Sequence, residues 1–182
     1  MITDEALALG IQQGNANDLA GLVQRHHSPL VGFLYRMTGG DRKLAEDLVQ
    51  ETFLRVLRAI DRYRYPRPFK PWLYTIATNL VRDHYKRADV RRTVSTPVDE
   101  IQLSGQYDPL PEEALEADEA MQQVVAALMQ LPDHQREVVI LRYTQELPLN
   151  DIAAALDIPV GTVKSRLSLG LRRLREMLEQ DQ

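Results

Sequence analysis

Apolar residues recur at steps of three and four through most of this chain, which predicts helices rather than strands. The clearest stripe lies in residues 41–60, where Asp41 follows two glycines and is suited to capping the first turn of a helix. The members of the stripe are Leu44, Leu48, Val49, Phe53, Val56, Leu57 and Ile60. We expect this stripe to face a hydrophobic core.

The other side of the same helix carries a polar strip with one exposed apolar residue. It consists of Asp47, Gln50, Glu51 and Leu54, which follow one another at helical spacing. Composition alone favours a solvated face, because charged strips on helices usually face water. A surface for a protein partner is the alternative.

Two further helices are expected ahead of this one. Residues 3–13 form a short helix with Thr3 as its N-cap and Gly14 as its stop. A longer apolar pattern occupies residues 17–37 and is interrupted by Ser28 and Pro29. Because proline is tolerated in the first turn of a helix, Ser28 either caps a restarted helix or precedes a kink.

A proline-rich loop and a basic helix follow. Three prolines in residues 63–71 predict a stiff, extended loop, with the helix resuming near Pro71 or Trp72. The apolar stripe of this helix contains Leu73, Ile76, Ala77, Leu80 and Val81, and the opposite arc contains Tyr74, Thr78, Asn79, Arg82, Tyr85 and Lys86. Aromatic, amide and cationic groups on one arc suit single-stranded bases. Trp72 is expected mainly as a core anchor, and Phe69 and Tyr85 as stacking groups.

The periodic pattern disappears from about residue 88 to residue 113, where proline, serine, glycine and acidic residues are frequent. This composition is typical of a flexible linker. We therefore predict an all-α protein with two small helical domains, at residues 1–92 and 114–182, joined by an acidic linker at residues 93–113.

The second domain contains the pattern of a helix-turn-helix. After helices at residues 114–130 and 134–144, a short helix at residues 149–156 and a long one from residue 160 are separated by a tight turn. The long helix opens with Gly161 and Thr162, whose free backbone N–H groups suit a phosphate. Lys164, Ser165, Ser168 and Arg172 are expected on one exposed face, with Arg166 beside them as a phosphate anchor.

The formal net charge of −4 is unevenly distributed. Residues 55–92 contain eleven basic and three acidic side chains, a local charge of +8, whereas residues 93–135 contain nine acidic and no basic ones. Binding to nucleic acid requires a local positive potential, which the first of these segments supplies.

Several classes of protein have no support in the sequence. There is no cysteine, and the four histidines show no metal-ligand spacing, so neither a metal nor another cofactor is expected. No nucleophile elbow, phosphate-binding loop or dinucleotide-binding turn is present, and we expect no enzyme. The longest apolar run, residues 124–129, is far too short to span a membrane, and the N-terminus lacks the basic flank of a signal peptide. A cytoplasmic location is therefore expected.

Three stretches in order resemble the sigma-70 type RNA polymerase sigma factors, specifically the small two-domain extracytoplasmic-function group (ECF, group 4). AEDLVQETFLRVLRAIDRY resembles the helix that binds core polymerase, and FKPWLYTIATNLVRDHYKR the helix that melts the promoter and reads the −10 element. LPDHQREVVILRYTQELPLNDIAAALDIPVGTVKSR resembles the domain that reads the −35 element. The resemblance covers almost the whole chain and implies a promoter-specificity subunit for transcription initiation.

The resemblance also implies roles for particular residues. Asp47, Gln50, Glu51 and Leu54 would bind core polymerase. The melted −10 strand would be bound by Arg64, Arg67, Phe69, Lys70, Trp72, Asn79, Arg82, Tyr85 and Lys86. The −35 duplex would be bound by Gly161, Thr162, Lys164, Ser165, Arg166, Ser168 and Arg172. An anti-sigma factor is a possible further partner, and the free protein is expected to be a monomer.

One departure from the family concerns the loop before Trp72. The family usually has small and polar residues there, whereas this chain has YPRPFKP, which predicts a stiffer and more cationic pocket for a flipped base. Two other classes of function remain open. A stand-alone helix-turn-helix regulator would be expected to dimerise, and an enzyme or scaffold would need a catalytic constellation.

Overall fold

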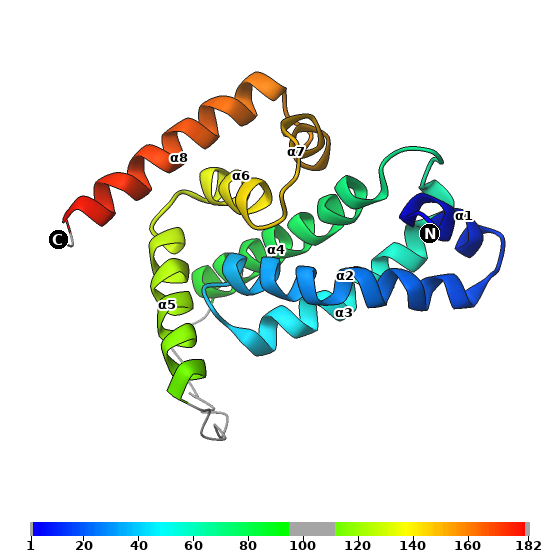
Figure 1. Ribbon diagram of the computed structural model, residues 1–182, viewed down its shortest axis with the longest axis horizontal. Coiled ribbons are helices and arrows are strands. Elements are labelled where there is room, and N and C mark those ends of the chain that lie inside the picture. Colours follow the sequence, from blue (N-terminus) through cyan, green and yellow to red (C-terminus); the bar gives the residue numbers. More distant parts are fainter. Residues whose placement is uncertain (1, 95–111, 181–182) are drawn as a thin grey trace.

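The computed structural model describes residues 2–94 and 112–180. Throughout this part of the chain the regular elements are helices, and no strand occurs, so the all-α prediction is confirmed. In chain order they are α1 (Asp4–Gln12), α2 (Ala16–Met37), α3 (Arg42–Ala59), the 3-10 helix η1 (Ile60–Arg62), α4 (Phe69–Val94), α5 (Glu112–Met129), α6 (Asp133–Tyr143), α7 (Leu149–Leu156) and α8 (Val160–Gln180) (Figure 1). None of the described helices combines the length and apolar composition that crossing a membrane requires.

The helix starts expected from capping residues are confirmed. Thr3 Oγ1 accepts a hydrogen bond from the backbone N–H of Ala6, and Asp41 Oδ1 accepts one from that of Leu44 at 2.9 Å. α2 is continuous through Pro29, so the alternative of a helix restarted at Ser28 is wrong. Gly39 and Gly40, with φ of +70° and +86°, turn the chain between α2 and α3 in a conformation that favours glycine.

α2, α3 and α4 enclose the core of the N-terminal half. Phe33 of α2 meets Tyr74 of α4 edge to face, with ring centroids 5.1 Å apart. Most of the stripe predicted for α3 is buried, as expected, but Leu57 is 37% exposed. It lies at the edge of the stripe, where the neighbouring helices no longer cover it.

α4 differs from its prediction at both ends and on one face. It begins at Phe69, two residues early, because Glu5 of α1 accepts a hydrogen bond from the backbone N–H of Phe69. It continues to Val94, whereas the sequence pattern ended near residue 88. Most of the predicted linker falls on residues 95–111, outside the described residues. Tyr74 and Thr78 were expected on the exposed arc, but both are fully buried.

The C-terminal half contains the predicted helix-turn-helix. α7 ends at Asp157, whose φ of 53° places it in the left-handed region, and α8 starts after Pro159. Val163 of α8 packs in a core with Ile152 of α7 and Ile140 of α6. The apolar side of α8 becomes less buried toward its C-terminus, since Leu167, Leu171 and Leu174 are only partly covered.

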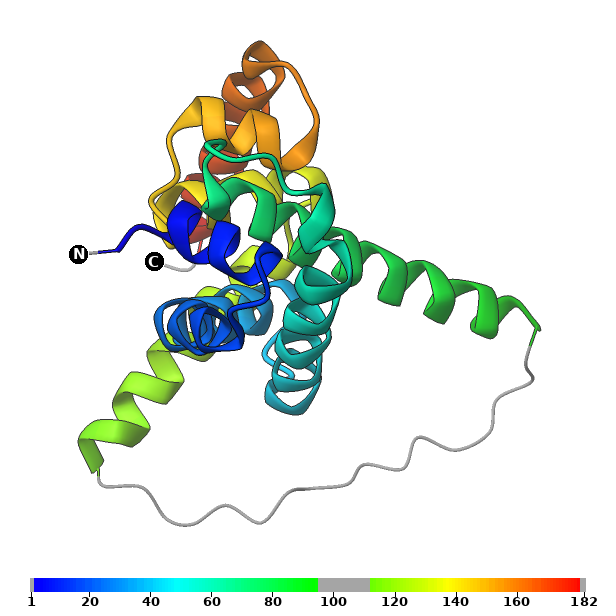
Figure 2. The same ribbon diagram turned by 90° about the vertical axis from the view of Figure 1, so that its right-hand side faces the viewer.

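The two halves pack against each other, and their buried residues form one hydrophobic cluster. Figure 1 shows α7 beside the first turns of α4, and Figure 2 shows α6, α7 and α8 stacked on the N-terminal helices. α5 rests on the turn between α2 and α3, where a Cβ at Gly39 would lie 3.3 Å from the side chain of Met129. This packing buries Tyr74 and Thr78, because α4 is covered from both sides.

Candidate nucleic-acid interface

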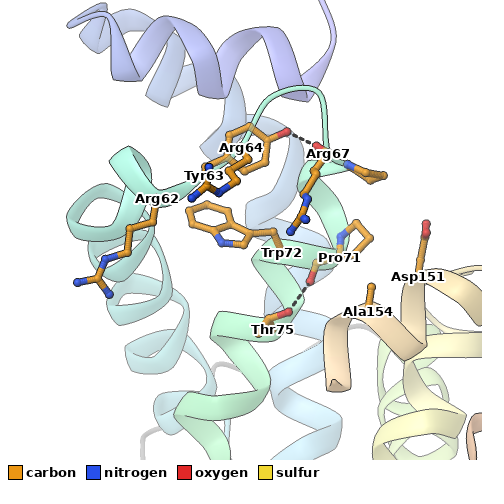
Figure 3. A pocket seen from close by; sticks show the side chains of 10 residues that line it. Arg62, Tyr63, Arg64, Arg67, Pro71, Trp72, Thr75, Asp151 and Ala154 are labelled. Atoms are coloured by element: carbon orange, nitrogen blue, oxygen red, sulfur yellow. Dashed lines mark hydrogen bonds between the residues drawn. The ribbon is translucent and has the colours of Figure 1, made fainter. Parts of the chain in front are cut away.

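A pocket of about 440 Å³ lies beside the loop that joins η1 to α4. It is lined by Arg62, Tyr63, Arg64, Arg67, Pro68, Pro71, Trp72, Thr75, Asp151 and Ala154 (Figure 3). Arg64 and Arg67 flank the indole of Trp72, while Arg62 points away from the loop. The pocket thus combines an aromatic wall with cationic groups, which is the combination that binds an unpaired base and its phosphate.

Aromatic packing and one hydrogen bond shape the loop of residues 63–68. The buried ring of Tyr63 contacts Trp72 and Phe69, at centroid distances of 5.3 and 5.8 Å. Its hydroxyl donates a hydrogen bond to the carbonyl oxygen of Arg67. Burial raises the pKa of Tyr63 to about 12, so the hydroxyl keeps its proton and remains a donor at neutral pH.

The expected roles of Phe69 and Trp72 are exchanged in the structure. Phe69 was expected to be an exposed stacking group, but its side chain is 0% exposed and packs against His26, Tyr63 and Trp72. Trp72 was expected mainly in the core, but it is only partly buried and lines the pocket. The rings of His26, Tyr63 and Trp72 surround Phe69, whereas one side of Trp72 stays open to the pocket.

The cations of the loop are available to a ligand. Arg62, Arg64 and Arg67 are exposed, and within residues 2–94 and 112–180 their guanidinium groups form no ion pair with an acid. Arg62 also borders a second hollow of about 330 Å³, shared with Arg55, Arg58, Ala59, Ile76 and Asn79. Asn79 is exposed there, as the sequence predicted.

Two other residues expected at the single-strand surface, Lys70 and Arg82, are bonded to the C-terminal half instead. Lys70 Nζ donates a hydrogen bond to the carbonyl oxygen of Gln145 at 2.7 Å. Arg82 forms an ion pair with Glu137, with Nε 3.0 Å from Oε1. Tyr85 is half-buried, and Lys86 is exposed. In this arrangement one part of the polar arc of α4 faces solvent, and another part contacts α6.

Sequence reasoning did not nominate several residues of the pocket. The run of basic and aromatic residues at 62–67 did point to its arginines as phosphate contacts, Arg62 among them, but not to Tyr63. Thr75 gave no such signal, and its hydroxyl donates to the carbonyl oxygen of Pro71. Asp151 and Ala154 come from α7, and nothing local to the loop could have placed them there.

The polar strip on α3 forms one accessible surface. Asp47 and Gln50 are exposed, and Leu54 is 46% exposed. Glu51 is half-buried and pairs with Arg55 at 3.1 Å and Arg58 at 3.5 Å. Two arginines therefore offset the charge of Glu51, while the carboxylate of Asp47 stays open to solvent.

The predicted face of the helix-turn-helix is accessible at the start of α8. Gly161, Lys164, Ser165, Ser168 and Arg172 are exposed, whereas Thr162 and Arg166 are half-buried. Ser165 Oγ donates to the carbonyl oxygen of Thr162 at 3.1 Å. Cationic and hydroxyl groups at the N-terminal end of a second helix have the chemistry needed to contact base edges and phosphates in a major groove.

Two family models match this chain. Sigma-70 region 2 matches residues 22–91, and Sigma-70 region 4 matches residues 121–174. The chain belongs to the sigma-70 family of RNA polymerase sigma factors, in its ECF group. It is 36% identical over 177 residues to the ECF RNA polymerase sigma factor SigW of Bacillus subtilis, covering 92% of each chain. It is 33% identical over 188 residues to the ECF RNA polymerase sigma-E factor of Haemophilus influenzae, covering 98% of this chain and 94% of the relative.

Solved structures of sigma factors resemble the whole arrangement. CnrH in complex with the cytosolic domain of CnrY superposes with a TM-score of 0.77 at 26% identity, covering 98% of this chain and 99% of CnrH. The sigma factor RpoE of Bartonella quintana, in complex with the anti-sigma factor NepR, has a TM-score of 0.70 at 26% identity and covers 92% of this chain and all of that one. This sigma factor is a promoter-specificity subunit of RNA polymerase.

Proposed function

We propose that this sigma factor engages polymerase and promoter through three separate surfaces. The α3 strip of Asp47, Gln50, Glu51 and Leu54 binds core polymerase. The pocket beside the loop of residues 63–68 binds a base of the melted −10 strand, and the exposed face of α8 binds the −35 duplex. Residues 1–92 and 114–182 act as the region 2 and region 4 domains, which fits the two family matches.

The observation that carries the −10 assignment is the pocket itself. A base that leaves the stack can rest on the exposed side of Trp72, while its phosphates meet Arg64 and Arg67. Stacking of one base on an aromatic ring contributes about 1–3 kcal/mol, which helps to offset the cost of unpairing it. The prolines in this loop limit its backbone freedom, so its shape is largely set before DNA arrives.

Promoter binding requires the two halves to separate from the arrangement seen here. Lys70 and Arg82 are held by Gln145 and Glu137, and Asp151 of α7 lies in the wall of the pocket. The carboxylate of Asp151 would repel an approaching phosphate. Polymerase that binds each half at its own site can supply the free energy for this separation, and it then presents both DNA surfaces at the spacing of a promoter.

The family supports a class of partner and a cellular location for this chain. The structure of RpoE holds the anti-sigma factor NepR, and that of CnrH holds the cytosolic domain of CnrY, so an anti-sigma factor is a candidate partner of this chain as well. We place the protein in the cytoplasm, where polymerase acts, and assign it no enzymatic activity of its own. Among the described residues no cluster of His, Asp and Glu could hold a metal ion.

Transcription in vitro tests the proposal. Core polymerase with and without this chain is incubated with duplex templates of randomised upstream sequence, and the 5′ ends of the RNA are sequenced. We expect new start sites, preceded by enriched −35 and −10 sequences, only when the chain is present. Tight sequence-specific binding to duplex DNA by the chain alone, together with a dimer in size-exclusion chromatography, would instead indicate a stand-alone regulator.

A further inference from the structure

α1 lies outside both stretches that match the family models, yet it contacts both ends of the pocket loop. The matches begin at residue 22, and α1 is Asp4–Gln12. Its apolar side is anchored in the core by Leu7 and Ala8, which are buried. Its polar side faces η1 and the first residue of α4, so this short helix reaches the two points where the loop of residues 63–68 is joined to helices.

Gln12 holds the first end of the loop. Its side-chain amide nitrogen donates hydrogen bonds to the carbonyl oxygens of Ile60 at 2.6 Å and Tyr63 at 2.8 Å. Ile60 opens η1, and its carbonyl oxygen also accepts from the backbone N–H of Tyr63 at 3.0 Å, while Tyr63 directly follows η1. Both N–H groups of one amide are thus used to define where the chain leaves η1.

Glu5 holds the second end. Its Oε1 accepts a hydrogen bond from the backbone N–H of Phe69 at 3.1 Å, and that N–H is one of the unpaired donors in the first turn of α4. A carboxylate at a helix N-terminus is also favoured by the helix dipole. Glu5 and Gln12 are seven residues apart, so they lie on the same side of α1.

A second contact from α1 supports the base of the pocket. Asp4 Oδ2 lies 2.7 Å from His26 Nε2, and the buried ring of His26 packs against Phe69 at a centroid distance of 5.7 Å. Phe69 in turn contacts Trp72, the aromatic wall of the pocket. The position of Trp72 is therefore linked to α1 through packed rings as well as through the loop.

We propose that α1 is a positioning element for the base-binding pocket, and that Gln12 and Glu5 are the positioning residues through which it acts. This inference rests on the proposed role of the pocket in −10 recognition. By fixing both ends of the loop, α1 holds Arg64 and Arg67 over Trp72 before DNA binds. A base then enters a preformed site without the cost of ordering the loop, and the site can discriminate between bases.

The test uses the complete chain assembled with bacterial core polymerase on duplex templates of randomised upstream sequence. Gln12→Ala removes both donors, and Glu5→Ala removes the acceptor, whereas Glu5→Gln keeps an oxygen that can accept from Phe69. Gln13→Ala is the matched control, since Gln13 is the adjacent amide and is exposed. The measured quantity is the enrichment of the preferred base at each −10 and −35 position.

We expect Gln12→Ala and Glu5→Ala to lower the enrichment at the most selective −10 position about fivefold, the effect of losing roughly one hydrogen bond. Enrichment at the −35 positions should not change, and Glu5→Gln and Gln13→Ala should behave like the wild type. The chain contains a single tryptophan, Trp72, so acrylamide quenching of its fluorescence reports the pocket directly. Quenching should rise in Gln12→Ala and stay unchanged in Gln13→Ala.

Three results overturn the inference. The first is unaltered −10 selectivity in both alanine variants. The second is a parallel loss at −10 and −35, which indicates a purely structural role for α1. The third is a wild type that directs initiation without selecting any −10 base. Failure of the wild-type chain to bind core polymerase in a native gel is a separate outcome, which overturns the proposed function and with it this inference.

Discussion

Arg82 of α4 and Glu137 of α6 form a two-pronged ion pair that joins the two halves of the molecule. Arg82 donates from Nε to Oε1 at 3.0 Å and from its terminal nitrogen to Oε2. The side chain of Glu137 is only 4% exposed, whereas that of Arg82 is 42% exposed. The hydrogen bonds to Glu137 raise the pKa of Arg82 above its ordinary value, so the guanidinium group keeps its proton. The buried carboxylate therefore depends on an arginine that we also assign to DNA.

Removing Arg82 should lower the free energy of unfolding by more than the net stabilisation that the ion pair contributes. Arg82→Ala leaves the carboxylate of Glu137 buried without its cation, which we expect to lower the free energy of unfolding by about 2–3 kcal/mol, allowing for the exposure of the arginine. In Arg82→Ala with Glu137→Ala, part of this loss should be recovered. Urea denaturation of the four proteins of this cycle gives the coupling energy. Lys86→Ala, exposed one turn further along α4, is the control, and strictly additive losses would contradict the prediction.

The hydroxyl of Thr78 should be dispensable for stability. Thr78 is fully buried, and its Oγ1 has no hydrogen-bond partner among the residues that the structure describes. Thr78→Val replaces this group by a methyl of similar size, so we expect the free energy of unfolding to rise by about 1 kcal/mol. Thr52→Val is the matched comparison, because the buried hydroxyl of Thr52 donates to the carbonyl oxygen of Leu48 at 2.6 Å. Thr52→Val should not stabilise the protein. If Thr78→Val destabilised the protein, the hydroxyl of Thr78 would have to be hydrogen-bonded.

Asp4 should contribute stability that disappears in acid. Burial alone would raise its pKa, but hydrogen bonds and attraction from Arg25 and His26 hold the pKa of Asp4 below its ordinary value of 3.8. The unfolded chain therefore takes up this proton at a higher pH than the folded protein. The contribution is present above the unfolded pKa and is lost as the pH falls through the folded pKa.

Urea midpoints of the wild type and Asp4→Asn measure this effect. The wild type should be more stable at about pH 6, and the difference should shrink by about pH 3. Asp61→Asn, which changes an exposed acid next to the same pocket loop, is the control and should show a much smaller difference. A gap between wild type and Asp4→Asn that is constant with pH would show that the carboxylate is not involved.

Charge reversal on α3 should separate polymerase binding from folding. Asp47→Lys places a cation in the middle of the exposed strip and touches no buried group, so the fold should be retained. We expect affinity for core polymerase to fall about tenfold or more at low salt, with a smaller change at high salt. Glu119→Lys reverses an exposed charge on α5, a helix that packs against α2, α6 and α8, and it should bind nearly as well as the wild type. Equal losses in the two variants would point to a general charge effect rather than a site.

Substitution on α8 should alter duplex recognition at one place. Lys164 is exposed near the start of α8, where a side chain can reach base edges in the major groove. Lys164→Ala should cost about 1–3 kcal/mol of discrimination at one −35 position and leave −10 selectivity intact. Sequencing of transcripts from randomised templates measures both preferences. Arg175→Ala, exposed near the far end of α8, should lower overall affinity at most, and relaxed −35 preference in that variant alone would contradict the assignment.

The local sequence pattern was sufficient to predict the helices, their capping residues and the helix-turn-helix. Side chains at three- and four-residue steps identify a buried stripe, and Thr3 and Asp41 cap helices through atoms a few residues away. The exposed residues on α3 and at the start of α8 could be named for the same reason. Among the described residues no other helix covers the exposed members of those faces, so the alternation of polar and apolar positions describes their surroundings well.

The burial of α4 and the shape of the pocket depended on contacts between distant segments. Periodicity predicts one apolar face, but α4 is covered on two, so Tyr74 and Thr78 are buried although they lie on its polar arc. A buried acid such as Glu137 is acceptable only beside its cation, and that cation comes from 55 residues earlier. Phe69 is enclosed by rings from α2, from the loop and from α4, whereas Trp72 keeps one side open to the pocket. The burial of a polar or aromatic side chain depends on the distant segment that packs over it. The spacing of residues along one helix does not identify that segment.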